Sequence, residues 1–500
     1  MNVSTKLSEH KLTEFISNLT DYLEQQQPGF FIYKKVNLRG AFERYLYFET
    51  IARPYSLLPL LKLIRPWRDA LEKSDFTKTF DSYWQPLSKA TFLNKVTTFF
   101  LPWLRLGRDF YRSIISNVLS AKSVSTTEKR PVGFFAINCR FVDFFKPLVS
   151  EFKSTTCLFF SSHSMLISGK VKEQGACPAL LPMPKGFSSG LSLSVWHPLF
   201  PVYLHLCIFF QQAYIALQQE RPEVLLFAEG TSHYDELMAR AAKQLEIPTI
   251  RIQSGRAGVL HSGYRNMCFD VMLCWSNDFV ERYKSVSPKP AYHVIGSPLL
   301  DEFHQLNERR VISTKPNRVV IYTQPVSKNV SAQDYLLLVK FAEDLLKRDE
   351  RIDIIVRKHP VDKHSGFDDL QQKYPHRISP MNAPEFSLAA TLINTQSAVG
   401  FFSTTLSEAA ACGVIPVILQ LDKSHSVYPF PEKHGAAIVV DSAEAAVDKV
   451  LQIQQQPEQF DLVRQKMQIF SQRFLGPNDG HSMQRLVGVI NQYIDGKAYE

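Results

Sequence analysis

The sequence predicts an α/β protein in which two doubly wound domains face each other across a cleft, preceded by a helical extension. Its 500 residues exceed one ordinary domain, and 45% of them are hydrophobic, which is enough for two cores. Strand-like runs alternate with helical ones in two successive series, the pattern of parallel sheets with crossover helices. The expected units are a helical extension (1–125), two Rossmann-like domains (126–312 and 313–475) and a helix returning to the first domain (476–500).

The extension alternates charged and bulky apolar positions with few β-branched runs, so we expect it to be mostly helical. Two of its stretches, 64–71 and 92–119, carry aromatic side chains beside arginines and lysines. Such a mixture can rest on an anionic membrane surface. The alternative is that the aromatic rings pack against the next domain. The polar stretch 121–129 is expected to be a linker.

Charge and cysteine content restrict the classes of function. The net charge of +9 fits an anionic partner, which could be nucleic acid, a membrane surface or a nucleotide sugar. The seven cysteines are odd in number and form no CxxC pair, which indicates reduced thiols and no zinc site. The N-terminus lacks the apolar core of an export signal, so we expect a cytoplasmic protein.

Six apolar runs form the strands expected in the first series: Val132–Ile137, Thr156–Ser161, Val224–Ala228, Thr249–Gln253, Val271–Trp275 and His293–Gly296. The segment 186–219 between them contains no Asp, Glu, Lys or Arg. Because prolines and histidines interrupt it, we expect a buried helix over Val202–Leu217 rather than a membrane span.

The second series follows the polar stretch 307–317. Its expected elements are strands at Arg318–Tyr322, Ile352–Val356, Ile415–Leu419 and Ala437–Val440, a helix at Ala332–Arg348, and final helices over Pro457–Ile494. In such domains ligands bind at the carboxyl ends of the strands. The residues that directly follow strands are therefore the candidates for a site.

One stretch of the second series, Phe401–Leu419, places hydroxyl side chains before a helix of small residues. Ser403, Thr404 and Thr405 open this helix, and Glu408 lies one turn further along. A capped helix N-terminus directs backbone N–H groups and the positive end of the helix dipole to one point, which suits phosphate. The carboxylate could reach a ribose hydroxyl. The alternative is an ordinary capped helix of an α/β domain.

A carboxylate follows the expected strand Val224–Ala228 in the first series. Glu229 and Gly230 come directly after the strand, and Asp235 comes five residues later. Because partial burial raises the affinity of a carboxyl group for protons, Glu229 is a candidate base. The alternative is a helix start at which acidic residues only meet the helix dipole.

Basic residues follow the expected strand Ile352–Val356. Arg357, Lys358 and His359 stand at its carboxyl end, and Pro360 ends the extended segment. These side chains could bind a phosphate through charge-assisted hydrogen bonds. The alternative for His359 is an ordinary histidine in a loop.

These three motifs, in this order, resemble those of bacterial GT-B glycosyltransferases that use CMP-activated sugars. The group comprises sialyltransferases, polysialyltransferases and the Kdo transferases of capsule and lipopolysaccharide synthesis. The resemblance covers about residues 130–475 and rests on Glu-Gly after a strand, His-Pro after a strand and a Ser/Thr pair that opens a helix. It implies the GT-B fold and a donor site in which His359, Ser403 and Thr404 hold the CMP phosphate.

The resemblance also implies that Glu229 is the acidic group of the transfer reaction. The sialyltransferase motif has two carboxylates before its glycine, and Ala228 occupies the first of those positions here. Asp235 therefore remains a rival.

A loop with the sequence SGRAGVLHSGYRN follows the expected strand Thr249–Gln253 and carries Arg256, His261 and Arg265. Given the resemblance, we expect this loop to close over the cleft or to bind the carboxylate of a 2-keto sugar acid, with Gly230 allowing substrate to approach. The alternative is a flexible interdomain loop.

The implied activity is transfer of a Kdo- or sialic-acid-like sugar from a CMP-sugar donor to a surface polysaccharide or glycolipid, without a metal or a cofactor. The implied partners are the donor, a glycan or lipid-linked acceptor and the cytoplasmic face of the inner membrane, and no nucleic acid. One alternative is a UDP-sugar transferase or an enzyme like UDP-N-acetylglucosamine 2-epimerase, whose ribose motif Glu408, Ala409, Gly413 and Pro416 also resemble. Another is a non-catalytic protein of glycan assembly.

Overall fold

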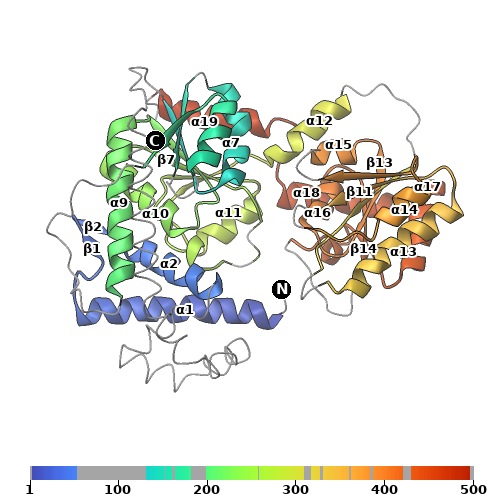
Figure 1. Cartoon of the computed structure of the whole chain (residues 1–500), viewed down its shortest axis with the longest axis horizontal. Helices are drawn as coiled ribbons and strands as arrows, with labels where there is room; N and C mark the ends of the chain where they lie inside the picture. The colour runs from blue at the N-terminus through green and yellow to red at the C-terminus, as the bar shows by residue number, and fades with distance from the viewer. Residues whose placement is uncertain are drawn as a thin grey trace.

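A computed structural model shows two lobes, each built around a parallel sheet (Figure 1). It describes residues 3–52, 131–152, 154–159, 164–181, 199–256, 258, 260–308, 317–326, 330–359, 362–382, 387–420 and 429–495. The aromatic and basic stretches 64–71 and 92–119, for which membrane contact was predicted, lie outside these residues, as does Pro360.

The first sheet has seven parallel strands in the order β5-β4-β3-β6-β7-β8-β9. Their bounds are β3 (Val132–Ala136), β4 (Thr155–Phe159), β5 (Cys177–Leu180), β6 (Val224–Ala228), β7 (Thr249–Ile252), β8 (Val271–Cys274) and β9 (Ala291–Val294). The order reverses between β3 and β6. This reversal is the switch point at which doubly wound sheets bind ligands.

Helices cover both faces of the first sheet because successive strand residues point to opposite sides. Phe135 and Phe227 belong to a core shared with α9 (Phe200–Glu220) and α10 (His233–Gln244). Phe134 and Leu226 belong to the opposite core, shared with α7 (Cys139–Glu151), α8 (Ser164–Glu173) and α19 (Ser482–Ile494). The helix α11 (Asn277–Lys284) follows β8.

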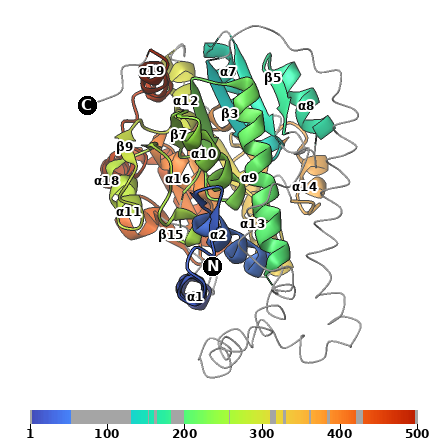
Figure 2. The same ribbon diagram turned by 90° about the vertical axis from the view of Figure 1, so that its left-hand side faces the viewer.

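In the part of the chain that the structure describes, α9 is the one helix long and apolar enough to cross a membrane. Within the protein, 72% of its apolar window is buried. Figure 2 shows α9 in front of β3 with α2 beside it. The buried helix predicted over Val202–Leu217 is therefore confirmed, with bounds a few residues wider at each end.

The N-terminal residues pack into the first core rather than standing apart from it. They form α1 (Val3–Gln26), a hairpin of β1 (Ile32–Tyr33) and β2 (Val36–Asn37), and α2 (Arg39–Ala52). Arg44 of α2 pairs with Glu236 of α10 at 3.2 Å, and both side chains are buried. Breaking a buried pair by removing one partner typically costs about 3–5 kcal/mol, so this contact fixes α2 to the domain.

The second sheet has six parallel strands in the order β12-β11-β10-β13-β14-β15. Their bounds are β10 (Arg318–Tyr322), β11 (Asp353–Lys358), β12 (Ile378–Asn382), β13 (Thr395–Gly400), β14 (Ile415–Leu419) and β15 (Ile438–Val440). One core contains residues of α13 (Ala332–Arg348), α17 (Ala443–Gln455) and α18 (Asp461–Phe474). The other contains residues of α15 (Leu388–Leu392) and α16 (Thr404–Ala411).

All predicted strands are present to within two residues at each end, but three strands of the two large sheets were not predicted, nor was the hairpin of β1 and β2. Two of them, β5 and β12, are edge strands that contain Pro178 and Pro380. Proline cannot donate a hydrogen bond to a neighbouring strand, so its presence argues against a strand in the sequence. It is tolerated at sheet edges, which is why both strands form although they were not predicted. The third, β13, is central but consists mainly of small and polar residues.

Two segments connect the lobes and contact each other. The first leads from β9 to α12 (Asp301–Glu308), and the second leads from α18 to α19. The carboxylate of Asp301 accepts hydrogen bonds from the amides of Ser482 and Met483 at 3.2 and 2.7 Å, which caps α19. Gly476 has φ +77°, and a Cβ there would lie 1.8 Å from the carbonyl oxygen of Trp275, so only glycine fits.

Candidate functional site

The backbone at the end of β6 adopts a conformation that side chains rarely take. Glu229 has φ +63°, in the left-handed region, where a residue other than glycine costs roughly 1–2 kcal/mol. Gly230 follows with the same φ, and a Cβ there would lie 2.8 Å from Phe269 and 2.9 Å from Arg251. Because strain of this kind persists only when the surroundings impose it, the end of β6 is a candidate functional position.

Arg251 of β7 provides that constraint. Its Nε donates a hydrogen bond to the carbonyl oxygen of Glu229, and its side chain is 1% exposed. The guanidinium lies over the rings of Tyr264 and Tyr283, at 5.1 and 5.3 Å from their centres. Among the described residues no carboxylate lies within ion-pair distance of it. The buried side chain of Arg251 thus fixes the backbone conformation of Glu229.

The carboxylate of Glu229 remains accessible, with 33% of the side chain exposed. Its Oε1 lies 3.6 Å from Nη2 of Arg140, which stands in the first turn of α7. Asn138 caps that turn by accepting a hydrogen bond from the amide of Phe141. Since Arg140 is largely exposed, the carboxylate can exchange this contact for a substrate.

Asp235 is in a different environment from Glu229. Its Oδ2 accepts hydrogen bonds from the amide and the hydroxyl of Ser232, at 3.0 and 2.6 Å, in a capping box at the start of α10. The carboxyl group is buried, and burial raises its pKa to about 6, although the hydrogen bonds from Ser232 act in the opposite direction. The structure therefore gives Asp235 a role in capping the helix.

The ring of His261 and the backbone of Arg265 make structural contacts. The ring of His261 stacks on Tyr47, with centres 4.6 Å apart, and its Nδ1 accepts a hydrogen bond from the amide of Gly263. Burial lowers the pKa of His261 to about 3, with the charges of Arg44 and Arg251 acting in the same direction, so the ring is neutral. The carbonyl oxygen of Arg265 accepts a hydrogen bond from Arg44.

Arg256 joins the two lobes. Its Nη1 donates to the carbonyl oxygen of Thr404 at 2.6 Å, and its Nη2 lies 3.1 Å from Oε1 of Glu408. Both partners are on α16. Burial raises the pKa of Glu408, and the charge of Arg256 opposes that shift. The two residues predicted to bind substrate and ribose therefore bind each other in this structure.

The second half of the candidate site lies at the switch point between β10 and β13. Ser403 begins α16, where its Oγ accepts a hydrogen bond from the amide of Thr405 and lies 2.6 Å from that residue's hydroxyl. The side chain of Gln324, which follows β10, donates to the carbonyl oxygen of Phe402. These contacts fix the hydroxyl residues at the carboxyl end of the sheet.

His359 lies beside these residues, at the end of β11. Its amide donates to Oγ1 of Thr323, which follows β10, at 3.2 Å. The hydroxyl of Thr323 in turn donates to Asp362, and the amide of Asp362 donates to the carbonyl oxygen of His359 at 2.8 Å. The side chain of His359 is exposed. The structure thus places His359 and Ser403 at the ends of strands that flank β10.

Arg357 and Lys358 have partners within the second domain. Nη1 of Arg357 donates to the carbonyl oxygen of Ser387 at 3.0 Å, and burial lowers the pKa of the guanidinium. Nζ of Lys358 pairs with Asp368 at 3.3 Å. The two side chains therefore contact the starts of α15 and of α14 (Asp368–Lys373).

Sequence reasoning missed four residues that organise these two halves: Arg251, Thr323, Gln324 and Asp362. A basic residue inside an apolar strand was the available signal for Arg251. Thr323 and Gln324 directly follow a predicted strand, the same signal that identified Glu229 and His359. Among the described residues no group of three or more His, Cys, Asp and Glu side chains could hold a metal ion.

Comparison with known proteins gives a likeness of fold. No family model matches the sequence, and no curated protein matches it in sequence. The structure is similar to a putative UDP-N-acetylglucosamine 2-epimerase from Listeria monocytogenes, with a TM-score of 0.50 and 13% sequence identity, over 74% of this chain and 98% of that one.

Two further similar structures have lower scores. The UDP-GlcNAc 2-epimerase from Neisseria meningitidis, bound to UDP-GlcNAc, gives a TM-score of 0.49 and 13% identity over 71% and 99% of the two chains. The wall teichoic acid polymerase TagF gives 0.47 and 11% over 82% and 100%. The likeness to the Listeria protein and the Rossmann-like strand order of both sheets show that this chain has the GT-B fold, as the sequence predicted.

Proposed function

We propose that this chain is a glycosyltransferase that moves a Kdo- or sialic-acid-like sugar from a CMP-sugar donor to a surface polysaccharide or glycolipid, at the cytoplasmic face of the membrane. The observation that carries the proposal is the arrangement at the second switch point. There, the end of β11 with His359 and the hydroxyl-rich start of α16 stand on either side of the end of β10.

This arrangement suits a phosphate group. The start of α16 offers backbone N–H groups, the hydroxyls of Ser403, Thr404 and Thr405 and the positive end of the helix dipole. The imidazole of His359 adds a donor on the other side. Such groups, fixed before the reaction, stabilise the charge of a departing nucleotide without a metal ion.

Glu229 is the acidic group that fits the transfer step, because its carboxylate is accessible whereas that of Asp235 is buried in a helix cap. It can deprotonate the acceptor hydroxyl, which then attacks the anomeric carbon and inverts its configuration. It can instead attack that carbon itself, so that a covalent sugar adduct forms and the configuration is retained.

A second candidate is a UDP-sugar-dependent enzyme of the same fold, either a transferase or an epimerase. It is favoured by the likeness to the putative UDP-N-acetylglucosamine 2-epimerase, which has a TM-score of 0.50. The contact between Glu408 and Arg256 weighs against a ribose-binding role for Glu408, because the carboxylate already has a buried partner.

A thermal-shift panel of CMP, UDP, GDP and CDP separates these candidates. A ligand that binds only the folded protein stabilises it by mass action, so we expect the largest shift with CMP. His359→Ala should weaken CMP binding by about 1.5–3 kcal/mol, the usual contribution of a hydrogen bond to a charged group.

His376→Ala is the matched control, because His376 is exposed in the same domain but lies away from these strand ends. A shift with UDP and none with CMP would replace the CMP-sugar proposal with the second candidate. Equal CMP affinity in the wild type and in folded His359→Ala would remove His359 from the phosphate site.

A further inference from the structure

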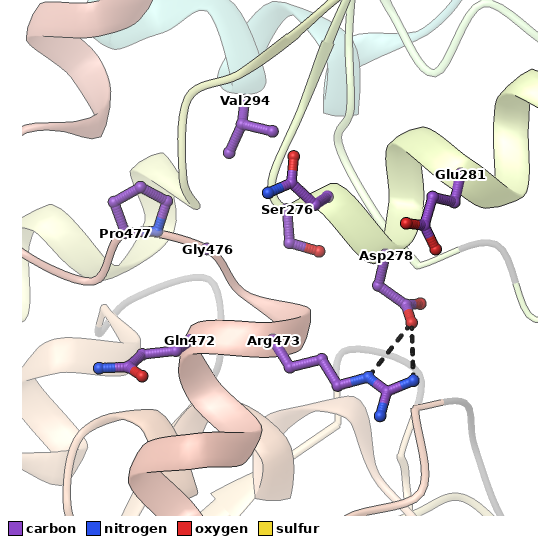
Figure 3. Close-up of a pocket in the computed structure, with 9 residues that line it drawn as sticks. Ser276, Asp278, Glu281, Val294, Gln472, Arg473, Gly476 and Pro477 are labelled. Atoms are coloured by element: carbon purple, nitrogen blue, oxygen red, sulfur yellow. Dashed lines mark hydrogen bonds and ion pairs between the residues drawn. The ribbon is translucent and has the colours of Figure 1, made fainter.

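A pocket lies between the two lobes, beside the segment that leads from α18 to α19. Its volume is about 510 Å³, within the range of ligand pockets. The first domain contributes α11 and the end of β9, and the second contributes α18 and the connecting Gly476 and Pro477 (Figure 3). None of the residues discussed above as catalytic or phosphate-binding lines it.

Ser276 supplies the observation that points to a ligand. It stands at the start of α11, is 1% exposed, and its hydroxyl has no hydrogen-bond partner. The hydroxyl points toward the space between α11 and α18 (Figure 3). A buried polar group without a partner is costly, so this hydroxyl calls for a hydrogen-bonding group inside the pocket.

The other lining residues determine which chemical class fits. Asp278 and Glu281 contribute carboxylates, Arg473 a guanidinium, and Asn277 and Gln472 carboxamides. Two carboxylates and one guanidinium give the lining a net charge of −1, which disfavours nucleotides and other anions. The lining also contains no aromatic ring on which a base could stack.

We propose that this pocket binds a neutral, hydroxyl-rich ligand, namely an uncharged saccharide unit. Carboxylates only accept hydrogen bonds, a guanidinium only donates them, and carboxamides do both. A sugar hydroxyl can donate and accept at once, so several hydroxyls on one ring satisfy this mixed set together. The inference goes beyond the proposed function, since it requires neither a nucleotide nor a transfer step.

The contact between Arg473 and Asp278 crosses the pocket, and a bound ligand can replace it. Arg473 lies 3.4 and 3.5 Å from Oδ1 of Asp278, which is long for a charge-assisted hydrogen bond. The side chain of Arg473 is 60% exposed and that of Asp278 is 13% exposed, so solvent screens the pair from the arginine side and reduces its contribution to stability. A saccharide hydroxyl can therefore insert between the two groups at small cost and contact both domains.

Saturation-transfer NMR on the full chain tests the proposal. The probes are galactose, N-acetylglucosamine and lactose, with N-acetylneuraminic acid as the anionic comparison. We expect saturation of at least one neutral saccharide and a several-fold smaller signal in Ser276→Ala and in Gln472→Ala. The control is Gln468→Ala, which removes an exposed carboxamide of the same helix outside the pocket and should leave the signal unchanged.

Gln472 is exposed, so its variant tests the pocket even if the change at Ser276 impairs folding. Unchanged signals in both pocket variants, stronger saturation of N-acetylneuraminic acid than of the neutral probes, or no saturation of any probe would each overturn the inference. The nucleotide panel is a separate measurement, so failure of the pocket and failure of the proposed function are distinguishable.

Discussion

The carboxyl end of β6 and the carboxyl ends of β10, β11 and β13 use polar residues in different ways. At β6 the accessible carboxylate of Glu229 stands on a backbone with positive φ. The buried Arg251 fixes this backbone through a hydrogen bond to its carbonyl oxygen. At the second switch point, hydroxyl residues, a glutamine, a histidine and a helix start stand at the ends of neighbouring strands, each held by local hydrogen bonds. The first arrangement fits the proposed reactive carboxylate, whereas the second fits the proposed binding of one phosphate.

Removing the charge of Glu229 tests this difference between the two strand ends most directly and should have the largest effect. Glu229→Gln keeps the size of the side chain, and we expect the release of nucleotide from the donor to fall by roughly 10²–10⁴-fold, the usual contribution of a general acid or base. The thermal shift with CMP should persist, because the residues proposed to bind its phosphate stand on the second sheet, whereas Glu229 follows a strand of the first.

Asp235→Asn is the matched comparison, since it changes a nearby carboxylate that caps α10. Near-normal turnover in Glu229→Gln together with loss of turnover in Asp235→Asn would transfer the acidic role to Asp235. A sugar adduct on Glu229 in the mass spectrum of the intact protein would instead show that Glu229 acts as a nucleophile.

A smaller effect is expected from Arg251→Met, which keeps a long side chain but removes the donor to the carbonyl oxygen of Glu229. Misplacement of a reacting group by about 1 Å can cost 10²-fold, so turnover should fall by up to about that factor with CMP affinity unchanged.

The double variant distinguishes positioning from a general loss of structure. If Arg251 acts only through Glu229, combining Arg251→Met with Glu229→Gln should reduce turnover no further than Glu229→Gln alone. Multiplication of the two losses would mean that Arg251 supports the fold or the site by another route.

The sequence predicted most of the fold where strand-like apolar runs alternate with helical segments. It predicted candidate site residues where a polar residue directly follows a strand. It predicted that Glu229 and His359 directly follow strands, and the structure places both at the carboxyl ends of strands, β6 and β11, where doubly wound sheets bind ligands. It also predicted β14 and α13 with the bounds that the structure shows. The edge strands β5 and β12 escaped because each contains a proline.

The roles of the basic residues could not be read from the sequence, since they depend on partners distant in the chain. Arg256 and Glu408 each looked like a ligand-binding residue, but they are 152 positions apart and pair across the lobes. His261 stacks on Tyr47 from the N-terminal segment. Burial decides whether such a residue binds a ligand or the protein itself, and burial arises only in the folded chain.

The last prediction concerns the stability that Asp235 contributes as a helix cap. Burial raises its pKa from 3.8 to about 6 in the folded protein, so the folded state holds the proton more tightly than the unfolded chain. Below pH 3.8 the group is protonated in both states and adds no penalty. Between pH 3.8 and about 6 the unfolded chain loses the proton first, so the free energy of unfolding falls as the pH rises.

Asp235→Asn keeps an acceptor oxygen for Ser232 but cannot ionise. The difference in unfolding free energy between this variant and the wild type should therefore shift in favour of the variant across that window, by roughly 1–3 kcal/mol at about 1.4 kcal/mol per pKa unit. Chemical denaturation at pH 4 and pH 7 measures it. If the difference in unfolding free energy stays constant with pH, the carboxylate of Asp235 is solvated as an anion in the folded protein. Asp235 would then again be a candidate for the acidic group beside Glu229.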